Sequence, residues 1–294
     1  ALLDSKVATG AYRFTIHPGK AVTVGVKAVI YMRKPVQKLE IAPLTSMFWH
    51  GRGRGVRAGD WHPAQHDSSD LVMANGNGEW VTRPLNDPLY TQITSYDMNQ
   101  PQGFGLIQQD RHFSSYEGLQ TKYQLRPSVW VKFIGKWGKG HIQLVELPTN
   151  NRDLDNIDAF WIPEHQPAPG VGYHFNYRLR FFLDNPKLIP NGHPVATYIG
   201  HGKAPGSRQV VIDFTGPGLS GLSASARVHA VLGVDRGAKI LDQSVKRDRF
   251  GHSWRVTATI LPVSGHPSDV RCYLVLNGKT MSDTWLYLLN AAKE

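Results

Sequence analysis

An alternation of apolar and polar residues, interrupted by turn residues, is the feature that most constrains the fold of this chain. It runs through residues 10–19, 21–32, 128–133, 140–148 and 173–182, each of which ends at or near glycine, proline or asparagine. Because successive side chains of a strand point to opposite faces, this period of two predicts strands with one buried face. Helical periodicity is scarce, and 29 glycines and 19 prolines supply turns. The sequence therefore predicts an all-β fold, most simply a β-sandwich.

The length of 294 residues is enough for two domains. Residues 183–207 hold four prolines and four glycines and break the strand rhythm, which is typical of a linker. We therefore expect a first domain at 1–183, a linker at 184–205 and a second domain at 206–294. The second domain has about six or seven short strand segments in about 90 residues, which fits an immunoglobulin-like β-sandwich without the usual Cys-Trp-Cys arrangement.

The formal net charge of +10 is spread along the chain. Residues 206–294 carry 11 Lys and Arg against 7 Asp and Glu, a net of +4, which leaves +6 for residues 1–205. Spread charge favours non-specific attraction to polyanions or membranes over a specific nucleic-acid site. The local exception is the Arg/Gly-rich loop at 50–59, for which a solvated surface loop is favoured over phosphate binding.

A single cysteine excludes an intramolecular disulfide. Cys272, Leu274 and Leu276 alternate onto one strand face, so the thiol is predicted to lie in the core rather than to act as a nucleophile. No apolar run approaches the ~20 residues that span a bilayer. Residues 1–14 lack the pattern of a signal peptide, so we expect any targeting segment to have been removed or to lie outside this piece.

Two acidic clusters are the candidates for chemistry. Residues 61–71 (WHPAQHDSSDL) place two histidines and two aspartates within nine positions, and residues 150–164 again combine carboxylates with aromatic residues. A helix would align His62 and His66 on a metal, but Pro63 disfavours one, so no metal is expected. No serine elbow, phosphate-binding loop or dinucleotide fingerprint is present, and no cofactor is expected.

Paired carboxylates beside aromatic rings suit the hydrolysis of a glycosidic bond. One carboxylic acid protonates the leaving oxygen, and one carboxylate activates water or attacks carbon. The rings of Trp61, Trp80, Phe160 and Trp161 offer apolar faces for sugar rings. From the residues alone, a carbohydrate site on a β-sandwich and two solvated acidic loops both remain open.

Long ordered motifs in this chain resemble a known family. They are 41–49 (IAPLTSMFW), 66–85 (HDSSDLVMANGNGEWVTRPL), 103–131, 137–149, 155–164 (DNIDAFWIPE) and 283–289. These segments resemble the periplasmic glucan biosynthesis proteins G and D, the OpgG/OpgD (MdoG) family. The resemblance implies a large β-sandwich followed by an immunoglobulin-like domain, a periplasmic location and a role in making osmoregulated periplasmic glucans. It also implies the endo-β-1,2-glucanase activity of catalytically characterised members.

Carried over from the family motifs, the catalytic carboxylates become Asp67 and Asp155, 88 residues apart. The resemblance suggests inverting hydrolysis, with Asp155 as general acid and Asp67 as general base, which reaches its water directly or through a relay. Inversion predicts carboxyl groups roughly 6.5–9.5 Å apart, against about 5–5.5 Å for retention. We also expect Asp155 to be buried and aromatic-lined, with its pKa raised so that it stays protonated near neutral pH.

Seven further residues are expected to bind substrate or support the carboxylates. They are Glu79, Trp80, Arg83, Asp110, Arg111, Tyr116 and Trp161. Trp161 suits a core position equally well, since it alternates with Phe160. Arg83 and Arg111 are alternatively expected to hold the catalytic carboxylates through charge-assisted hydrogen bonds.

The chain departs from the family pattern in three places. The loop between 49 and 66 is unusually rich in Arg and Gly, and Ser69 and Asp70 stand where an Asp-Gly pair is expected. The chain also begins inside the first domain, which would leave sheet edges and apolar faces exposed. We therefore expect the first domain to be incomplete here and completed by its N-terminal portion, as a separate chain or a cleaved segment.

Three functions remain in competition. The first is an enzyme that cleaves β-1,2-glucan. The second is a non-catalytic glucan-binding or scaffold protein that assists a membrane glucan synthase. The third is a polyanion-binding protein that uses the Arg/Gly loop and the net charge, for which binding would fall steeply with salt. No specific nucleic-acid partner is expected.

Overall fold

The computed structural model describes residues 1–53, 59–184, 188–235, 237–263 and 265–290, and within these ranges the chain is all-β, as predicted. Its only described helices are two single 3-10 turns, η1 (Phe113–Ser115) and η2 (Tyr123–Leu125). In the described part of the chain, no helix is long and apolar enough to cross a membrane. Much of the Arg/Gly loop, 54–58, lies outside the described residues.

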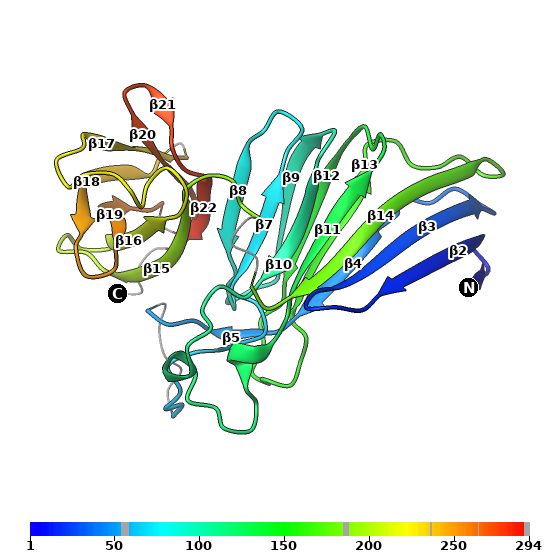
Figure 1. Ribbon diagram of the computed structural model, residues 1–294, viewed down its shortest axis with the longest axis horizontal. Helices are drawn as coiled ribbons and strands as arrows, with labels where there is room; N and C mark the ends of the chain where they lie inside the picture. The colour runs from blue at the N-terminus through cyan, green and yellow to red at the C-terminus, as the bar shows by residue number, and fades with distance from the viewer. Residues whose placement is uncertain (54–58, 185–187, 236, 264, 291–294) are drawn as a thin grey trace.

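One large sheet of 12 strands runs through the whole molecule (Figure 1). Its order is β1 (Leu2–Asp4), β2 (Ala8–His17), β3 (Val22–Met32), β14 (Gly172–Phe182), β11 (Ser128–Ile134), β10 (Gly103–Ile107), β7 (Asp70–Ala74), β8 (Trp80–Pro84), β22 (Thr284–Leu289), β20 (Ser268–Leu276) and β17 (Val228–Val234), with β21 (Lys279–Thr280) on β20. Neighbouring strands are antiparallel except β8 and β22, which are parallel.

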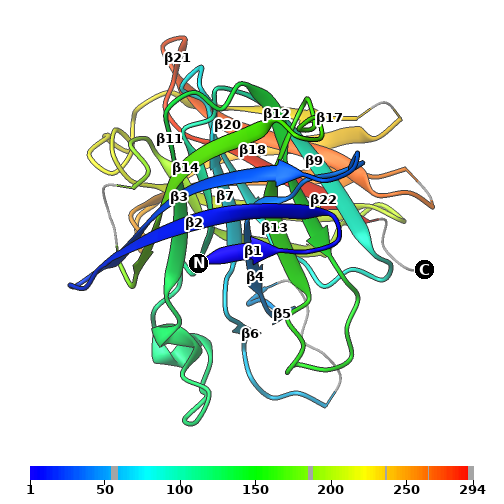
Figure 2. The ribbon, with the colours of Figure 1, turned by 90° about the vertical axis from the view of Figure 1, so that its right-hand side faces the viewer.

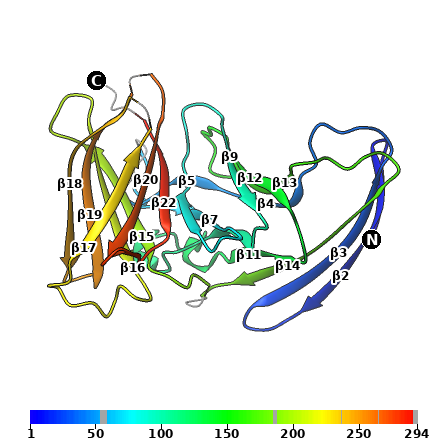
Figure 3. The same ribbon diagram turned by 90° about the horizontal axis from the view of Figure 1, so that it is seen from above.

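A second sheet covers one face of the central strands β14, β11, β10 and β7 (Figure 3). Its order is β4 (Ile41–Ser46), β13 (Ile157–Pro163), β12 (Lys139–Glu146) and β9 (Gln92–Asn99). Seen from above, these strands form a separate layer over β11 and β14 (Figure 3). Val26, Phe104, Val131 and Ile142 are buried between the layers, and their inward positions follow the alternation in the sequence.

The C-terminal lobe has a core of its own. The sheet β15 (His193–His201), β16 (Arg208–Thr215), β19 (Ser253–Leu261) and β18 (Lys239–Asp248) packs against β22, β20 and β17. Cys272 is fully buried in this core, and burial raises the pKa of its thiol to about 12, so the predicted core position is confirmed. Part of the stretch expected to be a linker is a strand, because β15 pairs with β16 from 193 to 201.

The two lobes are joined through the large sheet, where Thr284 and Trp285 of β22 pair with Val81 and Thr82 of β8. The Trp285 indole N–H also donates a hydrogen bond of 2.9 Å to Thr197 Oγ1 on β15. Strand β22 is therefore joined to β8 of the first lobe and to β15 of the second lobe.

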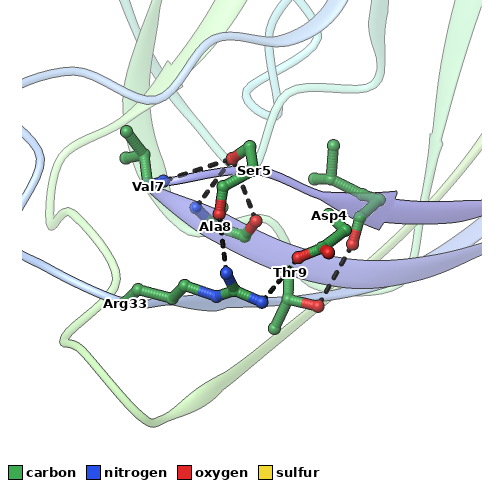
Figure 4. Close-up of polar contacts among 7 residues, drawn as sticks. Asp4, Ser5, Val7, Ala8, Thr9 and Arg33 are labelled. Carbon is green, nitrogen blue, oxygen red and sulfur yellow. Dashed lines mark hydrogen bonds and ion pairs between the residues drawn. The ribbon is translucent and has the colours of Figure 1, made fainter.

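At the other end, β2 and β3 diverge from the second sheet (Figure 3), and they lie nearest the viewer in Figure 2. The turn between β1 and β2 is tied by Ser5 Oγ, which accepts hydrogen bonds from the backbone N–H groups of Val7 and Ala8 (Figure 4). Arg33 donates to the Ser5 carbonyl and to Asp4 Oδ1, so this edge has a defined register. Phe14 and Ile16 of β2 are nevertheless 51% and 65% exposed.

Candidate active site

The loops at one end of the sheets carry the first acidic cluster. They surround the short pair β5 (Phe48–His50) and β6 (Gln65–His66), which lies below the sheets in Figure 1. Asp67 follows β6 directly, and its backbone N–H donates a hydrogen bond of 2.9 Å to the Met47 carbonyl. The Asp67 side chain is 28% exposed, so it is open to solvent on one side.

The second acidic cluster is fixed to the same segment by Asn156. This buried amide accepts a hydrogen bond of 2.8 Å from the Phe48 N–H and donates to the Phe48 carbonyl at 3.0 Å. It also donates to the Leu147 carbonyl at 3.0 Å. Asp155 precedes this clamp, so residues 47 and 48 hold both acidic clusters in one place although the sequence separates them.

The carboxyl groups of Asp67 and Asp155 share one electrostatic environment. Burial is the largest cause that raises the pKa of Asp67, and the charge of Asp155 raises it further. The Arg126 guanidinium acts in the opposite direction, with its Nε 3.2 Å from Asp67 Oδ1. The net result is a pKa for Asp67 above its ordinary value.

The expectation of a buried Asp155 is wrong, because this residue is exposed. It lies in the loop before β13, and the aromatic residues that follow it point into the core rather than around its carboxyl group: Phe160 and Trp161 are 4% and 0% exposed. The half-buried member of the pair is Asp67.

Beneath Asp67 lies a small apolar cluster formed by Met47, Ala64, Tyr116 and Tyr123. Burial raises the pKa of Tyr123, and the charge of Asp67 adds to this effect. The Arg126 guanidinium lies 5.9 Å from the centre of the Tyr123 ring. Sequence analysis did not single out Tyr123 and Arg126, since an arginine before a proline carries no pattern that reveals its partner.

Arg111 acts on the backbone rather than on the carboxylates. Its guanidinium donates hydrogen bonds to the carbonyls of Gln124 and Arg126 and to Ser128 Oγ. It therefore positions the loop that carries Arg126. The expected direct contact between Arg111 and a catalytic carboxylate does not occur.

Arg83 lies elsewhere, in a buried ion pair with Glu146. Arg83 Nη2 is 2.7 Å from Glu146 Oε2, and the two side chains are 1% and 0% exposed. Arg83 also donates to the Pro84 carbonyl and lies over the Tyr287 ring at 5.5 Å. Among the described residues, the ion pair joins β8 to β12 within the first lobe, only the contact with Tyr287 reaches the second lobe, and no contact with Asp67 or Asp155 is formed.

Three more of the expected substrate-binding residues lie away from Asp67. Trp161 is fully buried, with its ring edge-on to Phe133 and Trp137, and is a core residue. Trp80 stacks on Trp130 on the uncovered face of the large sheet. Glu79 accepts a hydrogen bond of 3.1 Å from Thr284 Oγ1 in the second lobe.

Asp110 and Tyr116 line a small cavity of about 100 Å³ beside the site, together with His66, Asp70 and residues of β15. The Tyr116 hydroxyl donates a hydrogen bond of 2.9 Å to the Asp110 carbonyl, and its ring is fully buried edge-on to His66. Tyr116 therefore shapes the floor of the site. Within the described ranges, no cluster of three or more His, Cys, Asp or Glu side chains is arranged to hold a metal ion.

Comparison with known proteins decides the family. The family described as "Periplasmic glucan biosynthesis protein, MdoG" matches residues 1–289. The chain belongs to this family. It is 42% identical to glucans biosynthesis protein G of Ralstonia nicotianae over 98% of this chain and 59% of that protein. It is 40% identical to the protein of the same name from Sodalis glossinidius over 99% of this chain and 58% of that protein.

This MdoG family member therefore spans about 59% of the length of the curated relatives it matches. The family resemblance and the periplasmic location expected from the sequence are both confirmed. The family is one of periplasmic glucan biosynthesis.

Proposed function

We propose that this MdoG family member hydrolyses β-1,2-linked glucan in osmoregulated periplasmic glucan biosynthesis, with Asp67 and Asp155 as the catalytic pair. The observation that carries the proposal is geometric. Asn156 is hydrogen-bonded to Phe48, and the Asp67 N–H is hydrogen-bonded to the Met47 carbonyl, so adjacent residues fix the loops of both carboxyl groups at one solvent-accessible edge. Such a pair is what glycosidic hydrolysis requires.

In this proposal Asp67 is the general base and Asp155 the general acid. Arg126 favours the charged form of Asp67, as a base that withdraws a proton from water requires. The exposed Asp155 would donate its proton to the leaving oxygen of a glucan bound across this edge. The reaction would invert the anomeric configuration. Asp110, Arg111 and Tyr116 would support this edge through the backbone contacts described above.

Product analysis of linear β-1,2-glucan tests the function. The full-length protein should release shorter oligosaccharides, and Asp67→Asn and Asp155→Asn should each lower the rate by about 10²–10⁴-fold while the near-UV circular dichroism is kept. Asp153→Asn is the matched control, because Asp153 is exposed on the same loop two residues away. Full activity in either catalytic variant would refute the pair.

The two roles can be separated with an oligosaccharide that carries a nitrophenyl leaving group, which departs without protonation. Such a substrate should restore activity to Asp155→Asn and leave Asp67→Asn inactive. The reverse pattern would exchange the roles. If the wild type binds glucan but never cleaves it, the hydrolysis proposal fails. The scaffold function, in which the protein assists a membrane glucan synthase, would then take its place.

We also propose that the first domain, 1–183, is a β-sandwich completed by an N-terminal portion of the family's first domain, and that residues 206–294 together with β15 form an immunoglobulin-like β-sandwich. The inner face of β2 supports completion, since Phe14 and Ile16 are more than half exposed there. A native complex or longer polypeptide should protect these two side chains from hydroxyl-radical labelling. If Phe14 and Ile16 are labelled to the same extent in that longer protein or complex as in the 294-residue chain alone, the proposal is contradicted.

A further inference from the structure

The uncovered face of the large sheet holds a groove that the proposed hydrolysis does not use. It lies on the side of β11 and β14 opposite the second sheet (Figure 3) and encloses about 700 Å³. We call it the outer groove. Its lining includes Thr23, Trp80, Trp130, Lys132, Arg178 and Arg180.

The aromatic floor of the outer groove is a stacked pair of indoles. The rings of Trp80 and Trp130 are 5.4 Å apart and inclined by 16°. Trp130 can lie flat on the sheet because β10 has Gly103 and Gly105 beneath it, where a Cβ atom would come within 2.8 and 2.9 Å of the indole. Trp130 is only 7% exposed, so the half-buried Trp80 supplies most of the accessible ring surface and Trp130 supports it from below.

The rim of the outer groove and the neighbouring sheet face are cationic. Lys132 lies directly opposite Arg178, and Arg180 follows two residues along β14 on the same face. Further out, Arg13 of β2 lies directly opposite Lys27 of β3. These side chains alternate with residues that pack into the inner core, so all five point outward.

Like charges directly opposite each other destabilise an antiparallel pair. Among the described residues, none of these five cations forms an ion pair or a hydrogen bond with an acidic side chain. The face therefore keeps two unfavourable pairs, Lys132/Arg178 and Arg13/Lys27, without the carboxylates that would neutralise them. A bound anion would remove this repulsion.

We propose that the outer groove binds a saccharide that carries phosphate or carboxylate groups. Stacked indoles fit the apolar face of a sugar ring, and the lysine and arginine side chains fit its anionic substituents. A concave groove suits a chain of sugars better than a flat bilayer. The groove thus differs from a neutral-glucan site by its charge.

The outer groove is separate from the Asp67 site. Strand β7 begins at Asp70, beside the site, and ends at Ala74, which pairs with Trp80. Four residue steps along a strand are roughly 14 Å, and the linings of the outer groove and of the cavity beside Asp67 have no residue in common. Binding there can be lost without loss of hydrolysis, so the proposal does not rest on the proposed function.

Tryptophan fluorescence titration of the full-length protein tests the proposal, in an Asp67→Asn background so that the ligand is not cleaved. The probes are a linear β-1,2-glucan, its carboxymethylated form of equal length, and inorganic polyphosphate. We expect the carboxymethylated chain to bind at least about tenfold more tightly than the neutral chain at low salt, with the difference shrinking as salt screens the charges.

Arg178→Gln/Arg180→Gln should abolish that preference, and the matched control Lys239→Gln/Arg249→Gln, on exposed residues of the second lobe, should keep it. Trp80→Ala should weaken binding of the carboxymethylated chain several-fold and leave binding of polyphosphate unchanged. Equal binding of neutral and anionic chains would overturn the proposal. So would an equal loss in the control, or a Trp80→Ala variant that binds the carboxymethylated chain as well as the wild type.

Discussion

Two arginine–carboxylate pairs in this molecule have the same chemistry and opposite surroundings. Arg83 and Glu146 are 2.7 Å apart with 1% and 0% of their side chains exposed. Arg126 and Asp67 are 3.2 Å apart with 48% and 28% exposed. The first pair is enclosed by the junction of two lobes, and the second faces solvent beside another carboxyl group. The difference teaches that surroundings, not residue type, separate a structural pair from a candidate catalytic one.

The buried pair has several further partners, although Arg83 Nε has no hydrogen-bond acceptor among the described residues. Glu146 Oε1 accepts a hydrogen bond of 2.7 Å from the Asn86 N–H, and Tyr96 and Tyr287 lie against the guanidinium. Burial is the largest single cause and lowers the pKa of Arg83, but Glu146, Tyr96 and Tyr287 together outweigh it and hold that pKa above its ordinary value. Asp67 instead has one cationic partner, Arg126, and the negative charge of Asp155 nearby.

Glu146→Gln should therefore cause the largest loss of stability. It leaves the Arg83 charge buried without a counter-ion, which costs about 3–5 kcal/mol of unfolding free energy. Urea denaturation measures this cost. Arg83→Met/Glu146→Leu removes both charges and should recover most of it. A loss below about 1 kcal/mol in Glu146→Gln would mean that the ion pair between β8 and β12 does not stabilise the fold.

Asp283, just before β22, is a third case for this comparison. It is a buried carboxyl group that has no arginine partner among the described residues. Burial raises its pKa to about 8, opposed only by a hydrogen bond from Thr82. The folded pKa lies above the unfolded value near 3.9, so its stabilising effect is complete below about pH 4 and is lost as pH rises to 8. Each pH unit in that window costs at most about 1.4 kcal/mol.

Asp283→Asn should flatten this pH dependence and be more stable than the wild type at pH 8. Denaturant unfolding of both proteins between pH 4 and 9 measures the two curves. Parallel curves across the window would show that Asp283 is ionised in the folded protein.

Asn156 links the two acidic clusters, and Asn156→Leu should break that link. The substitution leaves the Phe48 N–H and carbonyl without their partner, which costs about 1–3 kcal/mol. We expect glucan hydrolysis to fall in kcat more than in KM, since Asp155 and Asp67 lose their relative position. Asn151→Leu in the exposed part of the same loop is the control, and an equal effect there would contradict a positioning role.

Arg126→Gln should have the smallest effect on stability, below about 1 kcal/mol, because the pair is partly exposed. Its effect should appear in the pH profile instead. Arg126 lowers the pKa of Asp67, so its removal raises that pKa. A general base must be ionised, so the acidic limb of kcat/KM should move to higher pH. Arg249→Gln should leave the limb in place, and an unmoved limb in Arg126→Gln would exclude Asp67 as the base.

The sequence predicted the strands and the core thiol well, because period-two alternation reports directly which face a side chain occupies. It could not assign partners to polar residues. Arg83 was expected near the carboxylates and lies with Glu146 instead, since no local pattern encodes a contact between β8 and β12. Exposure of Asp155 was missed for the same reason: the aromatic residues after it turn into the core.

Trp80 illustrates a second limit. An aromatic residue beside an acidic motif suggested a sugar contact at the catalytic site, yet the strand places it at the far end of β7 and β8 on the other face. Its stacking on Trp130 depends on two glycines of a third strand, β10. Such a three-strand arrangement follows from sheet order, which alternation alone does not specify.

The measurement that tests the central claim most directly is the titration of the Asp67 carboxyl group by NMR in three proteins: the wild type, Asp155→Asn and Asp153→Asn. If Asp67 and Asp155 form one site, removal of the Asp155 charge lowers the pKa of Asp67. Asp153→Asn then leaves it nearly unchanged. An Asp67 pKa that is the same in all three proteins would show that the two clusters are separate loops, and would contradict the paired site.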